Sequence, residues 1–153
     1  MSNFAHQCKK DSMKNIHSYW AYVVLIVLIY AVVNASIGFI KKKEFTDKDL
    51  RIGLFGLIVC HIQLLIGLVW YFMSPWFAAL LSDAGAVMKE KSVRLLAVEH
   101  PITMIIAIAI ITVGWSKHKK KTVAIEKFKI FSIFYGVGLL LMLSKIPWSN
   151  WFS

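Results

Sequence analysis

The chain has 153 residues, of which 58% are hydrophobic, and its mean hydropathy is +0.64. Globular proteins contain about 45–50% apolar residues, so this composition leaves almost no residues for a soluble domain. The formal net charge of +10 does not indicate a nucleic-acid partner, because most of the basic residues gather in the connections between apolar blocks.

A polar tail of mixed charge occupies residues 1–16 and precedes the first apolar block. Neither this tail nor the length of the block after it is typical of a cleavable signal peptide. We therefore expect residues 17–153 to form a single membrane domain.

Four apolar blocks follow, each close to the ~20 residues that a helix needs to cross a bilayer core. They occupy residues 18–40, 52–73, 95–115 and 130–148. The third block contains Glu99, and the fourth contains Lys145 near its end, from which a lysine can reach the interface. Backbone groups in lipid must be hydrogen bonded internally, and the blocks lack the period-two alternation of strands. The sequence therefore predicts an all-α, integral membrane four-helix bundle.

The charge distribution predicts the orientation of this bundle. The connections at residues 40–52 and 115–130 together hold 11 of the 18 basic residues. The positive-inside rule then places both connections in the cytoplasm and both termini on the outer, periplasmic side of a bacterial inner membrane. The long connection between the second and third blocks, residues 74–92, begins with an apolar stretch at 75–81 that we expect to be a short interfacial helix near the mouth of a site.

Three histidines lie in or beside the apolar blocks. His17 opens the first block, His61 lies inside the second and His100 inside the third. An ionisable residue in the membrane is costly and is therefore a candidate functional residue. The alternative is that neighbouring helices or headgroups satisfy these imidazoles.

Depth along the helices favours a pairing of His61 with His100. With a rise of ~1.5 Å per residue, His61 lies ~14 Å below Trp70 and His100 lies ~12 Å beyond Ser92. If both boundaries lie three residues later in the sequence, the depths become ~18 and ~8 Å and no longer match. His17 stays at the outer surface in either case, where it suits a propionate or a quinone headgroup.

The faces of the predicted helices are compatible with a flat cofactor. His61 shares its face with leucines, whereas His100 shares its face with Met104 and several small residues that give clearance. Ordinary helix packing produces the same pattern. Cys8 and Cys60 form no C-x-x-C motif, so a haem here is not attached through such a motif.

Glu99 is the other costly residue. It lies ~100° from His100 around the helix. We considered three roles for its carboxylate: a hydrogen bond to a ligating imidazole, proton transfer, or an ion pair with Arg94 or Lys91.

Four short segments resemble a family of small bacterial four-helix membrane proteins that are called cytochrome-b-like. They are residues 17–20 (HSYW), 61–67 (HIQLLIG), 98–101 (VEHP) and 146–148 (IPW). In that family an arginine often stands where this chain has Tyr19, which weakens a role of this region in holding a propionate. The resemblance implies a haem b protein that functions in electron transfer.

The leading hypothesis is therefore a haem b protein with His61 and His100 as axial ligands and His17, Glu99 and Met104 around the cofactor. Its electrons would come from or go to a quinol or another membrane subunit in the respiratory chain. A chain with almost no soluble part is expected to belong to a larger complex or a homo-oligomer, and to be an electron-transfer or accessory subunit more than a stand-alone enzyme.

Three alternatives remain. The first is a cofactor-free accessory or assembly subunit of a membrane complex. The second is a copper site built from His17, His61 and His100 with Glu99 or Met104, since imidazole and thioether suit copper. The third is a proton-coupled transporter, for which the single mid-span carboxylate gives little support.

Overall fold

A computed structural model describes the backbone of residues 2–151 and the side chains of residues 8–149. Four long helices run through it. They are α1 (Ser2–Ile40), α2 (Asp47–Met73), α6 (His100–His118) and α7 (Ala124–Lys145). A short helix α5 (Lys91–Arg94) and a π-helical turn (Leu95–Glu99) lead directly into α6. No strand occurs in the described part of the chain.

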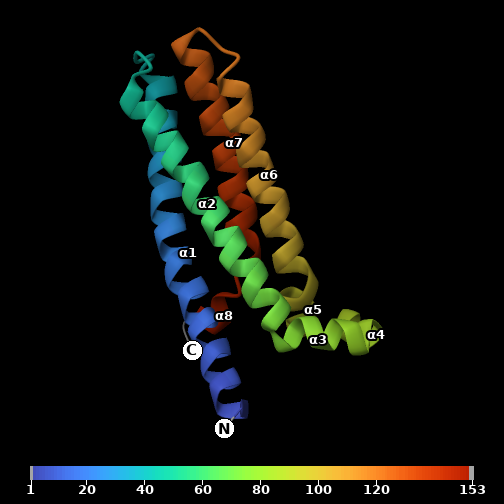
Figure 1. Ribbon diagram of the computed structural model, residues 1–153. Helices are drawn as coiled ribbons and strands as arrows, with labels where there is room; N and C mark the ends of the chain where they lie inside the picture. Colours follow the sequence, from blue (N-terminus) through green and yellow to red (C-terminus); the bar gives the residue numbers. More distant parts are fainter. Residues whose placement is uncertain (1, 152–153) are drawn as a thin grey trace.

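The long helices form a bundle in which α1 packs against α2 and α7, and α6 packs against α7 and α2 (Figure 1). Each of the four, with α6 counted from Lys91, is long and apolar enough to cross a membrane, and many of their large apolar side chains are exposed on the outside of the bundle. The chain is a multi-pass membrane protein, and the predicted all-α four-helix bundle is confirmed. Both termini lie at one end of the bundle, which we call the terminal end (Figure 1).

The helix α1 differs most from the predicted elements. Its 39 residues correspond to ~58 Å, about twice the ~30 Å of a bilayer core. Residues 2–16, which belong to the polar tail seen in the sequence, continue the helix beyond the bundle (Figure 1). His17 therefore lies within a continuous helix and not at its start.

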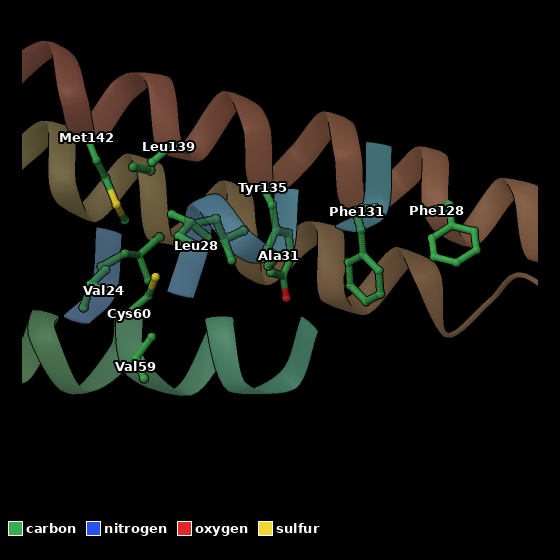
Figure 2. Packing of buried hydrophobic residues seen from close by; sticks show 14 residues of the cluster. Val24, Leu28, Ala31, Val59, Cys60, Phe128, Phe131, Tyr135, Leu139 and Met142 are labelled. Carbon is green, nitrogen blue, oxygen red and sulfur yellow. The ribbon is translucent and has the colours of Figure 1, made fainter. Parts of the chain in front are cut away.

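The core is built by large side chains that lie against very small ones. Leu28, Cys60, Ile111 and Tyr135 are completely buried between the helices (Figure 2). A Cβ atom on Gly138 would lie 2.6 Å from Ile111, so α6 and α7 approach too closely for any side chain there. This is the small-residue packing that membrane helices use in place of a hydrophobic driving force.

The connection between α2 and α5 forms an arm that leaves the bundle at its terminal end. It consists of α3 (Pro75–Ser82) and α4 (Ala84–Lys89), and it extends sideways from the end of α2 (Figure 1). The Ser74 hydroxyl accepts a hydrogen bond from the Phe77 backbone and so caps α3. The helix expected at residues 75–81 is confirmed, although most of it extends away from the bundle.

Candidate functional site

A cavity of about 480 Å³ opens among the helices at the terminal end of the bundle. Its wall is mainly apolar and comes from α1, α2, α6 and α7, together with the first residues of α3. His17 and His100 both line it, as does Met104. A volume of this size falls within the ~300–1,000 Å³ of typical ligand and cofactor sites.

The imidazoles of His17 and His100 lie close to each other in this cavity. Their ring centroids are 6.3 Å apart, and the ring planes are inclined at 86°. The Nδ1 atom of His100 lies 2.8 Å from the Lys145 carbonyl oxygen, which can only accept, so Nδ1 carries the proton. The neutral ring of His100 then keeps its lone pair on Nε2, the atom that remains for a ligand.

The imidazole ring of His17 packs against Gly67, which leaves room for the ring because it has no side chain. A Cβ atom on Gly67 would lie 3.0 Å from Cε1 and 3.3 Å from Nδ1 of His17. The Nδ1 atom is buried and has no hydrogen-bond partner among the described residues. A buried polar atom without a partner is costly in a protein interior, and a ligand is one way of satisfying it.

Gln63 joins α2 to α1 beside this ring. Its Nε2 donates to the His17 backbone oxygen at 3.0 Å, while its Oε1 is buried without a partner in the described residues. Gln63 and Gly67 are not among the site residues that the sequence predicts. Their spacing of four residues, on a face that meets His17, was the signal for a site.

The backbone around His100 departs from a regular α-helix. The His100 N–H bonds to the carbonyl of Leu95, five residues earlier. Pro101 has no N–H, so it cannot donate to the Ala97 carbonyl as an α-helix requires. The Tyr71 hydroxyl of α2 donates to that carbonyl instead, at 2.7 Å. Such π-helical turns are frequent at functional sites, and this one sets the direction of the His100 side chain.

The carboxylate of Glu99 makes two ion pairs. Its Oε1 lies 2.8 Å from Nε of Arg94, and its Oε2 lies 2.8 Å from Nζ of Lys145. The predicted pair with Arg94 is confirmed, whereas the pair with Lys145 was not foreseen. Glu99 is not part of the cavity wall, and the His100 imidazole bonds to the Lys145 carbonyl, not to this carboxylate.

His61 lies away from this site. Its side chain is exposed on the outer surface of the bundle, with Nδ1 2.9 Å from the Leu57 carbonyl and Nε2 3.4 Å from the Thr112 hydroxyl. The preceding residue, Cys60, is completely buried, and a rotation of ~100° per residue then turns His61 outward. The structure therefore brings His100 together with His17 and not with His61, in contrast to the predicted pair.

A compact metal site is not formed by these residues. Across the described residues, no three His, Cys, Asp or Glu side chains gather in an arrangement that could hold a metal ion. The copper site that we considered needs His17, His61 and His100 at one point, and His61 does not reach the other two.

Comparison with known protein families, curated proteins and solved structures finds no match for this chain. The resemblance to cytochrome-b-like proteins thus stays a prediction, and the function has to be argued from the geometry of the site.

Proposed function

We propose that the protein binds haem b in the cavity, with His17 and His100 as the axial ligands, and that it transfers electrons within the membrane. The observation that carries this proposal is the separation of the two imidazoles. Imidazole nitrogens ligate transition metals at ~2 Å, and a ring nitrogen lies about 1 Å from the ring centre. Two imidazoles on opposite sides of one metal therefore have centres about 6 Å apart, close to the 6.3 Å between His17 and His100.

The number of donors also favours haem over a free metal ion. Zinc sites in proteins use three or four side-chain ligands, whereas the haem macrocycle supplies four nitrogens and needs one or two from the protein. Two neighbouring histidines fit the second case, since no group of three His, Cys, Asp or Glu side chains that could hold a metal occurs among the described residues. The volume and the apolar wall of the cavity suit a macrocycle in the same way.

The cavity is amphipathic, as haem is. Its interior is apolar, whereas Lys10 and Lys14 line it on the part of α1 that extends beyond the bundle (Figure 1). These lysines are four residues apart and so lie on one face of the helix. Ammonium groups at that position would pair with the two propionates of the cofactor, as His17 had been expected to do.

The chemistry follows from the ligand set. Haem iron with two imidazole ligands exchanges single electrons at a potential that the ligands, burial and hydrogen bonds determine. His17 and His100 would hold the iron on both sides, and the apolar wall would exclude water. With both termini on the periplasmic side of a bacterial inner membrane, the cavity would open toward the outer leaflet. A quinol or a second membrane subunit could exchange electrons there.

The visible absorption spectrum of detergent-purified protein, oxidised and then reduced, tests this proposal. We expect a Soret band with sharp α and β bands, and we expect His17→Ala and His100→Ala each to abolish haem retention. His61→Ala is the matched control and should retain the full spectrum. A colourless wild-type protein made with ample haem supply would overturn the proposal and favour a cofactor-free accessory subunit. Loss of haem in His61→Ala alone would restore the pair predicted from the sequence.

A further inference from the structure

We infer that Glu99 is a positioning residue for His100, and that it acts through Lys145. This inference deepens the proposed function, because it concerns the orientation of one proposed axial ligand. Glu99 and His100 are neighbours in the sequence, and both side chains bind the same residue of α7. Glu99 holds the ammonium group of Lys145 at 2.8 Å, and His100 donates to its backbone carbonyl, also at 2.8 Å.

The carbonyl of Lys145 is available because α7 ends there. Ile146 has extended backbone angles, and the following Pro147 has no N–H. The last four carbonyls of a helix have no partner within the helix, so the Lys145 oxygen needs a donor from elsewhere. The imidazole of His100 supplies that donor across the boundary between α6 and α7.

The hydrogen bond fixes the protonation pattern of His100. A helix C-terminus carries partial negative charge, which favours a donor at Nδ1. With the proton on Nδ1, Nε2 is the ligating atom, and a carbonyl partner raises its basicity. The position of the Lys145 carbonyl therefore determines which nitrogen faces the cavity.

The ion pair keeps that carbonyl in place. In the described part of the chain α7 is followed by the four-residue helix α8 (Trp148–Trp151), and the Lys145 side chain is 37% exposed. Without Glu99, the long lysine side chain is free to turn toward the interface, and α7 can shift relative to α6. Arg94 holds the second oxygen of Glu99 and also donates to the Met88 carbonyl at 2.7 Å, which fixes the carboxylate from the other side.

Nitrogen-15 NMR of histidine-labelled protein without haem tests this inference directly. The shifts of the two ring nitrogens distinguish a proton on Nδ1 from a proton on Nε2, and His100→Ala assigns the signals. We expect wild-type His100 to be protonated on Nδ1 alone, and Glu99→Gln to give a mixture of both tautomers. Glu126→Gln is the matched control, since Glu126 pairs with Lys121 at 3.2 Å at the opposite end of α7.

Haem retention gives a second measurement. Loss of a residue that orients a metal ligand typically weakens binding by 10–100-fold, and we expect roughly a tenfold loss in Glu99→Gln with none in Glu126→Gln. If Glu99→Gln does not fold, Lys145→Met removes the same ion pair and leaves Glu99 with Arg94. A single Nδ1 tautomer of His100 in the folded variant would overturn the inference. If the tautomers change as expected and no form of the protein binds haem, the positioning role stands and the proposed function fails.

Discussion

Pro101 leaves a carbonyl that another helix has to satisfy. The Ala97 oxygen lacks the donor that residue 101 supplies in an α-helix, and Ala97 is 1% exposed, so water does not replace that donor. The hydroxyl of Tyr71 reaches it from α2. This hydrogen bond holds α2 against the turn before His100, so Tyr71 both lines the cavity and helps to shape the site.

Removal of the Tyr71 hydroxyl should destabilise the protein. We expect Tyr71→Phe to lower the free energy of unfolding by about 0.5–1.5 kcal/mol, because it removes the hydrogen bond to the buried Ala97 carbonyl. Tyr30→Phe, at a side chain that is 53% exposed, is the control and should change the stability by less than about 0.5 kcal/mol.

The variant Pro101→Ala tests whether the missing N–H of Pro101 is the reason that the Tyr71 hydroxyl stabilises the protein, since alanine at this position has an N–H. In that background Tyr71→Phe should cost much less than in the wild-type protein. Equal costs in both backgrounds, measured by unfolding in detergent, would show that Tyr71 acts through packing instead.

Gly67 should be needed for the position of His17. In Gly67→Ala the new Cβ would lie 3.0 Å from the ring, and displacement of the imidazole costs about 0.5–1.5 kcal/mol of rotamer strain. We therefore expect haem retention to weaken by up to about tenfold. Gly136→Ala is the matched control, because its Cβ would meet only Val32 at 3.9 Å. Haem titration of the two variants measures the difference, and equal affinities would argue against His17 as a ligand.

The sequence could not predict which histidine lies next to His100, as the position of His61 shows. Depth along a helix can be read from residue number, but the face that a helix turns inward depends on its neighbours. Cys60 and His61 are both plausible core residues, and packing against α1 and α7 selected Cys60. His100, a predicted site residue, lines the cavity, whereas its neighbour there depended on contacts between helices that no single helix specifies.

The N-terminal part of the helix α1 could not be predicted from the sequence either. Polar residues before an apolar block have no hydrophobic pattern, so the tail gave no sign of being helical. In the structure it continues α1 and brings Lys10 and Lys14 to the cavity. The approximate positions of the other long helices were predictable from apolar blocks of membrane length, but their starts were not. The predicted spans began at residues 52 and 130, whereas α2 begins at Asp47 and α7 at Ala124.

The two lysines on the extension of α1 should contribute to the affinity for haem. We expect the double variant Lys10→Gln and Lys14→Gln to weaken haem binding about fivefold at low salt, since exposed ion pairs contribute ~0.2–1 kcal/mol each. High salt should reduce the difference from wild type, because it screens exposed charges. Lys9→Gln is the control, as Lys9 is exposed and does not line the cavity. An unchanged affinity in the double variant would place the carboxylates of the ligand elsewhere.

The orientation of the whole molecule can be tested with its own cysteines. Cys8 is exposed near the terminal end, and Cys60 is buried in the bundle. Because 11 of the 18 basic residues lie at the opposite end, we expect a membrane-impermeant thiol reagent to label Cys8 in intact spheroplasts. Cys8→Ser should remove the labelling. Labelling only after the membrane is opened would show that the termini face the cytoplasm.

The bundle as a whole was predictable because a bilayer allows few solutions. Four long apolar blocks must become helices, and short connections at one end make neighbours antiparallel. The arm formed by α3 and α4 was only partly foreseen, since its helices are short and their direction depends on how α2 and α5 end.

The arm has a mechanical consequence for the site. It is fixed where it leaves the bundle, next to Tyr71, and again where it returns, through the hydrogen bond from Arg94 to the Met88 carbonyl. Tyr71 and Arg94 are also the residues that hold Ala97 and Glu99, on the turn before His100. A protein that binds the arm and displaces it would therefore also move the turn before His100, the proposed iron ligand, without entering the cavity. A thinner membrane beneath the arm would have the same effect.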